Sequence, residues 1–110
     1  MRSTKTNAGS PSKNKVCIAL GKSLKAHRIE KDKSQEVLGF EAAVDRTYIS
    51  QIERGVGNPS VLTLAHLCHA LGITLADLFT PVTTSLAPDE NARRANHSKA
   101  ALKPPKSRLR

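Results

Sequence analysis

The sequence predicts an all-α fold, a compact domain of five short helices between two basic tails. Apolar residues recur at the helical spacing i, i+3, i+4, i+7, most clearly at Leu64, Leu67, Cys68 and Leu71. Within residues 16–79, residues that favour helix starts precede the apolar runs, and glycines that favour helix ends follow them. No stretch shows the alternation of apolar and polar residues that is typical of a half-buried strand.

The first helix is expected from about residue 16 to residue 31. Its core-facing residues are Leu20, Leu24, His27 and Arg28. We interpret His27 as a half-buried packing residue rather than a functional one. A second helix follows Ser34, whose hydroxyl can accept a bond from a free N–H group of the first turn. This helix offers Leu38 and Ala42 to the core.

The third helix carries Ile49 and Ile52, which are three residues apart and can face one core together. Asp45 is expected to cap its start, and Gly55 to end it in a left-handed conformation. Most other side chains in its stretch RTYISQIERG (residues 46–55) are of types that can form hydrogen bonds. This polar display is either an ordinary solvated face or a surface that reads a ligand.

A fourth helix is expected between Ser60, as its cap, and Gly72, and Thr74 then opens a short fifth helix, LADLF. The apolar residues of this last helix are Leu75, Leu78 and Phe79. A domain of this size buries only about 60% of the surface of its unfolded chain and is marginally stable alone. We therefore expect these apolar residues to be exposed and to form the interface of a homodimer.

The positive charge of the chain lies at its two ends. The 110 residues carry a formal net charge of +9, yet residues 16–79 hold seven basic and seven acidic residues. The sequence predicts a disordered basic tail over residues 1–15, the helical domain over 16–80, and a flexible basic tail over 81–110. In the second tail, Pro88, Asp89 and Glu90 are the residue types of a helix start. Recognition by the neutral domain must therefore depend on individual side chains.

Composition also indicates where the protein works. The chain lacks a run of about 18 apolar residues, so no membrane span is expected. The apolar run VCIAL (16–20) is too short for the core of a signal peptide. Two cysteines, Cys17 and Cys68, are too few for a disulfide framework, which favours a reduced compartment. The expected location is the cytoplasm.

Residues 20–79 resemble the helix-turn-helix domains of the lambda-repressor-like, or Xre, family of bacterial and phage regulators. The strongest matches are SQE at 34–36, RTYISQIERG at 46–55, NPS at 58–60 and LGI at 71–73. The resemblance implies that the second and third helices form the helix-turn-helix and that the third lies in the major groove of DNA. It also implies a structural ion pair between Arg28 and Glu53.

The resemblance implies a set of DNA-binding residues on and around the third helix. They are Gln35, Arg46, Thr47, Tyr48, Ser50, Gln51, Arg54 and Asn58. Arg46 and Gln51 are the best candidates for base edges, because their side chains can pair with guanine and with adenine. Gln35 is implied to hold the DNA backbone and to brace the third helix.

The sequence departs from the family pattern at several positions. Lys33 replaces a frequent apolar residue just before the second helix. Ala43 stands where the turn often has glycine, which leaves open whether this position needs a positive φ. Val56 and Gly57 lie in a loop that is often basic, so phosphate contacts are expected to be fewer there.

Other chemistries receive little support. His66, Cys68 and His69 are close in sequence, but Cys68 shares the apolar face of its helix and the two histidines do not. We interpret them as a core cysteine and surface histidines, and we expect no metal, no cofactor and no enzymatic activity.

The predicted function is a sequence-specific double-stranded-DNA-binding transcriptional regulator, a homodimer on a palindromic operator. The alternative is a protein-interaction module, antitoxin-like or bound by an acidic partner.

Overall fold

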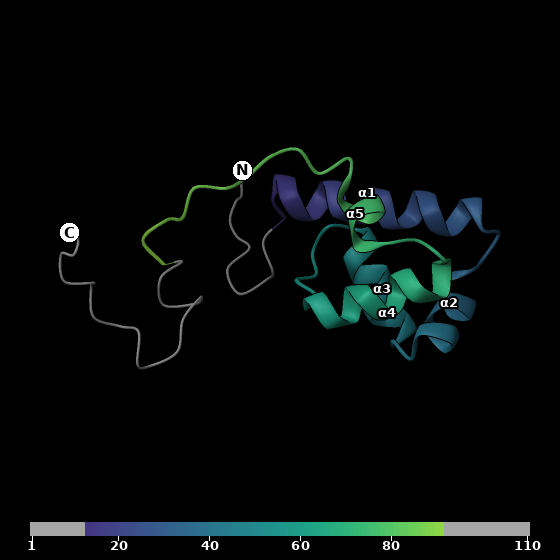
Figure 1. Cartoon of the computed structure of the whole chain (residues 1–110). Helices are drawn as coiled ribbons and strands as arrows, with labels where there is room; N and C mark the ends of the chain where they lie inside the picture. Colours follow the sequence, from purple (N-terminus) through teal and green to yellow (C-terminus); the bar gives the residue numbers. More distant parts are fainter. Residues whose placement is uncertain (1–12, 92–110) are drawn as a thin grey trace.

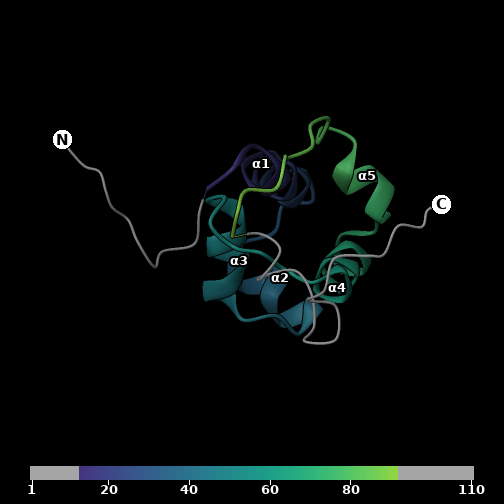
Figure 2. The same ribbon diagram turned by 90° about the vertical axis from the view of Figure 1, so that its left-hand side faces the viewer.

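The computed structural model describes residues 13–91, and the predicted five-helix, all-α architecture is confirmed (Figure 1). The helices are α1 (Lys15–Glu30), α2 (Gln35–Ala42), α3 (Arg46–Glu53), α4 (Val61–Leu71) and α5 (Leu75–Phe79). Figure 2 looks along α1 and shows the other four helices arranged around a common centre. No helix within residues 13–91 has the length and apolarity needed to cross a bilayer.

Side-chain caps begin four of the helices. Ser34 and Ser60 accept the expected bonds from Val37 and Thr63 N–H groups, at 3.0 and 3.1 Å. Thr74 and Asp77 cap α5 reciprocally. A cap that sequence reasoning missed is Asn14, whose Oδ1 accepts from the Cys17 N–H at 2.8 Å.

The prediction for Asp45 is wrong in one respect. Asp45 occupies the cap position of α3 with an extended backbone, but its side chain makes no capping hydrogen bond. The first-turn N–H groups of α3 therefore have no carboxylate bound to them. Gly55, with φ of 83°, ends this helix region in the left-handed conformation that was expected.

The core is one cluster to which all five helices contribute. Its fully buried side chains are Leu24, Leu38, Ile49, Ile52, Leu67, Leu71 and Leu78. α1 packs on α3 and α5, and α2 packs on α3 and α4. α1 lies close to the backbone of α3 at Gly21, where an added Cβ would lie 2.8 Å from the carbonyl oxygen of Glu53. The crossing of these two helices thus depends on a residue without a side chain.

The structure corrects one residue of the expected dimer interface, Leu78. Leu78 is 0% exposed and belongs to the core, and its carbonyl oxygen accepts a 2.6 Å hydrogen bond from the buried hydroxyl of Ser23. Leu75 and Phe79 are partly buried against the same core. Leu78 is therefore unavailable to a second copy of the folded domain, because five short helices already close around it.

The chain after α5 returns along α1 (Figure 1). Val82 donates its N–H to the Phe79 carbonyl at 2.8 Å and packs against the core, beyond the boundary expected at residue 80. Further on, Leu86 reaches the start of α1. The Pro88–Glu90 stretch forms no helix up to residue 91, where the structure describes only a turn. Any continuation of that expected helix lies outside the described residues.

Candidate nucleic-acid interface

α3 has one buried face and one polar face. Ile49 and Ile52 are fully buried, and Tyr48 packs partly against the core. On the other face Arg46 and Thr47 are exposed. Two further predicted residues, Ser50 and Gln51, lie half-buried one turn later. The structure therefore groups the predicted α3 residues around one outward-facing surface.

The end of α3 is fixed by the carboxylate of Glu53. Arg28 of α1 donates to both of its oxygens, from Nε at 2.7 Å and from Nη2 at 3.0 Å. Gln35, the first residue of α2, donates to the same carboxylate at 3.0 Å. The side chains of Arg28 and Glu53 are only 12% and 3% exposed. The predicted ion pair is present, and Gln35 braces α3 in the way the resemblance implied.

The ion pair with Glu53 changes the pKa of Arg28. Its hydrogen bonds to Glu53 raise the pKa of the Arg28 guanidinium, against the opposing effect of burial. The guanidinium also donates from Nη1 to the Lys33 carbonyl oxygen at 2.7 Å. Arg28 therefore joins the end of α3 to the turn between α1 and α2. This network holds α3 at a fixed angle to α2.

Lys33, which replaces a frequent apolar residue, has a bonding role of its own. Its ammonium group pairs with Glu41 of α2 and donates to the carbonyl oxygen of Ala70 at 2.8 Å. Ala70 lies in the last turn of α4, where the helix dipole favours a cation. A single lysine thus links α2 to α4 in place of an apolar contact.

The turn between α2 and α3 adopts the geometry that glycine favours, although the residue is alanine. Ala43 has φ of 58° and ψ of 42°, which is the left-handed region. The Val44 N–H then returns to the Gly39 carbonyl at 2.9 Å. The sequence left the conformation of Ala43 open, and the structure shows that the position does require a positive φ.

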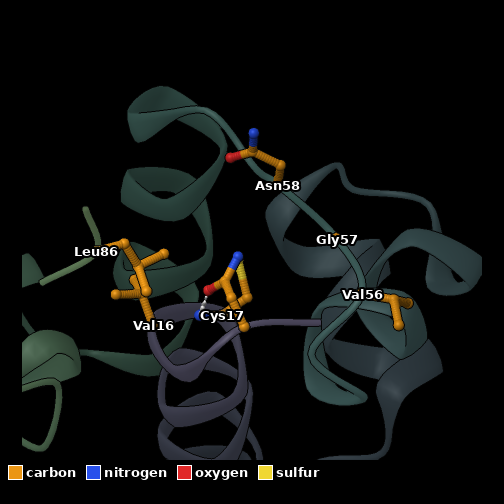
Figure 3. A pocket seen from close by; sticks show the side chains of 7 residues that line it. Val16, Cys17, Val56, Gly57, Asn58 and Leu86 are labelled. Carbon is orange, nitrogen blue, oxygen red and sulfur yellow. Dashed lines mark hydrogen bonds between the residues drawn. The ribbon is translucent and has the colours of Figure 1, made fainter. Parts of the chain in front are cut away.

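Beyond α3, two further predicted residues lie on its continuation. Arg54 ends the helix, and its Nη1 donates to the hydroxyl of Ser50 at 2.8 Å. Asn58 is exposed in the loop that leads to α4. This loop borders an open hollow of about 460 Å³, which Leu86 and the start of α1 complete (Figure 3). All eight predicted DNA-binding residues therefore lie on α3, at the start of α2 or in the following loop.

The histidines and cysteine of α4 do not converge. Cys68 is buried, and burial, with a smaller effect of Asp77, raises the pKa of its thiol. His66 and His69 are exposed on the outer side of the helix. Across residues 13–91, no three histidine, cysteine or acidic side chains come together as metal ligands would.

A short helix braced by the preceding helix, joined to it by a tight turn and presenting polar side chains outward, defines a helix-turn-helix DNA-binding protein. The comparisons with known proteins agree with this class. The sequence profile described as "Helix-turn-helix" matches residues 24–78, half of the chain, and the protein belongs to this lambda-repressor-like family of transcriptional regulators.

Relatives identify the branch of the family to which this chain is similar. It is 43% identical over 70 residues to the control protein C.MunI of a Mycoplasma species, covering 63% of this chain and 95% of that protein. It is 39% identical over 66 residues to the control protein C.BamHI of Bacillus amyloliquefaciens, covering 59% of this chain and 82% of that protein.

Two solved structures share the fold. The restriction-modification controller protein C.AhdI from Aeromonas hydrophila superposes with a TM-score of 0.56 at 36% identity, covering 57% of this chain and 96% of that one. The clp gene regulator ClgR from Corynebacterium glutamicum superposes with a TM-score of 0.60 at 33% identity, covering 74% and 100%.

Proposed function

We propose that this protein is a sequence-specific regulator that reads double-stranded DNA with α3 in the major groove. The observation that carries the proposal is the outward polar face of α3, held in place by the Glu53 carboxylate. A major groove is wide enough to admit one helix, and side chains of the first turns reach the base edges. Arg46 and Gln51 are assigned to bases. Gln35, Arg54 and Asn58 are assigned to phosphates.

The protein is proposed to act as a homodimer on a palindromic operator, with half-sites about one helical turn apart. Because Leu78 is buried, the partly exposed Leu75 and Phe79 remain as candidates for the dimer contact. Analytical ultracentrifugation tests this assignment. The wild type should sediment as a dimer, and Leu75→Ser should shift it toward the monomer. A wild type that is monomeric at micromolar concentration would contradict the proposed homodimer.

Selection of bound fragments from random duplexes tests sequence reading directly. The wild type should enrich a two-fold symmetric consensus at about 0.15 M salt. Arg46→Ala should lose one base preference at a cost of about 1–3 kcal/mol. Lys25→Ala is the matched control, because it removes another exposed cation, one that lies on α1. Equal enrichment of every duplex by the wild type would refute the proposal.

The basic tails are proposed to add affinity without sequence preference. A variant that lacks residues 1–12 and 92–110 retains Val82 and Leu86, which contact the domain, and loses nine of the 18 basic residues. Its affinity should fall for all duplexes alike. Each phosphate contact that is lost should reduce the slope of log affinity against log salt by about 0.9. A changed consensus would instead assign base reading to a tail.

The likeness to control proteins favours a regulatory target. We propose that the operator lies upstream of restriction and modification genes; the support for this target is the likeness to C.AhdI, which is described as a restriction-modification controller protein. The selected consensus should then occur in the promoter region of such genes beside the gene for this protein. Its absence there, with a strong match elsewhere in the genome, would leave DNA reading intact and refute only this target.

A further inference from the structure

α2 carries an apolar patch that faces away from the core. The patch consists of Ile29 at the end of α1 with Val37 and Phe40 of α2, which are 58%, 45% and 88% exposed. Ile29 and Val37 line one open hollow together with the turn residues 32–34. Phe40 stands one turn after Val37 on the same face of α2. Adjacent exposed apolar side chains of this kind mark interaction surfaces more often than isolated ones do.

Neither the fold nor the proposed DNA contact uses this patch. The buried residues of α2 are Leu38, Gly39 and Ala42, which lie on the opposite side of the helix. Gln35, which braces α3, shares that buried side. Val37 and Phe40 therefore lie on the side of α2 that faces away from α3 and the core.

The segment that contains the patch, residues 29–41, is rich in carboxylates. The acidic residues of this corner are Glu30, Asp32, Glu36 and Glu41, four of the nine in the chain. The basic residues among them are Lys31 and Lys33, and the Lys33 ammonium already bonds Glu41 and the Ala70 carbonyl. The corner carries a net charge of −2, whereas the outward face of α3 presents the exposed cations Arg46 and Arg54. The outward face of α3 and the corner that holds the patch thus differ in the sign of their charge.

We propose that the α2 apolar patch docks a cationic segment of another protein, one that places apolar side chains on Val37 and Phe40. Phosphates are repelled by the carboxylates, so nucleic acid does not fit this face. An acidic protein partner, which the sequence left open, is disfavoured for the same reason. Burial of the phenyl ring supplies affinity, and the acidic rim supplies orientation and a faster encounter.

A synthetic amphipathic helical peptide with leucines on one face and lysines on the other serves as the probe. Titrated into the isotope-labelled full-length protein, it should shift the amide signals of α2 and of residues 29–37. Phe40→Ala should weaken its binding about tenfold or more, as truncation of a central aromatic anchor does. Val61→Ala is the matched control, because Val61 is 66% exposed but lies on α4. The affinity of this variant for the peptide should stay within about twofold of that of the wild type.

Each remaining outcome decides the proposal. A peptide with glutamates in place of lysines should not bind, and higher salt should weaken the lysine peptide. Equal binding by Phe40→Ala, or signal shifts centred on α3, would overturn the proposal. A change in the oligomeric state of Phe40→Ala would assign the patch to a second copy and would also overturn it. Unaltered thermal unfolding and operator binding of Phe40→Ala keep this test separate from that of the proposed function.

Discussion

Removal of the Glu53 carboxylate should destabilise the domain rather than change its sequence preference. Glu53→Ala leaves the guanidinium of Arg28, whose side chain is 12% exposed, without its anion and deletes three hydrogen bonds of 2.7, 3.0 and 3.0 Å. Breaking a buried pair costs about 3–5 kcal/mol, and the remaining bond to the Lys33 carbonyl favours the lower end. A loss of about 3 kcal/mol lowers the Tm of a domain of this size by about 12–24 °C.

Thermal unfolding followed by circular dichroism measures this loss. Glu30→Ala is the control, since the Glu30 side chain is 74% exposed and lies 3.9 Å from His27. Its unfolding free energy should change by less than about 0.5 kcal/mol. The double variant Arg28→Met, Glu53→Leu should recover much of the loss, because neither charge is then buried alone. If Glu53→Ala melts within about 3 °C of the wild type, the carboxylate does not hold the three helices together.

Three further substitutions test the local geometry by thermal unfolding. Ala43→Gly should raise stability by about 1 kcal/mol, because alanine at φ of 58° is strained; a lower Tm would contradict this. Gly21→Ala should destabilise by about 1–3 kcal/mol despite its better helix propensity, since the new Cβ meets the α3 backbone at Ile52; an unchanged Tm would show that α1 moves freely. Hydrogen bonds from Thr74 lower the pKa of Asp77, so its stabilising effect is present above pH 4 and is lost as pH falls through the folded-state pKa. The Tm difference between wild type and Asp77→Asn should therefore shrink from pH 6 to pH 3, and a constant difference would exclude this role.

Local signals explain why so much of the fold could be predicted. Caps such as Ser34 and Ser60 act within three residues, so the sequence alone predicts their bonds. The failures depend on relations between distant segments. Leu78 was expected at the surface because the return of α5 onto Ser23 of α1 is not visible in the sequence. The role of Gly21 likewise appears only once α1 and α3 cross.

The candidate site was predicted by a different route. Polar side chains on one short helix do not by themselves separate a solvated face from a reading face, and the family resemblance supplied that distinction. The structure adds how this face is held in place, since the Glu53 carboxylate accepts hydrogen bonds from both Arg28 and Gln35. The α2 apolar patch was not predicted, because Phe40 in a short helix is as typical of a core residue as of an exposed one.

The position of Glu53 also affects the electrostatics at the two ends of the α3 helix dipole. A carboxylate in the last turn of a helix is unfavourable by about 0.3–1 kcal/mol, because the dipole is negative there. The guanidinium of Arg28 offsets this effect and converts an unfavourable position into the junction of three helices. At the forward end, the first turn of α3 contains no acid and the Asp45 side chain binds none of its N–H groups. α3 therefore directs the positive end of its dipole outward with Arg46, while its negative end is neutralised inside the domain.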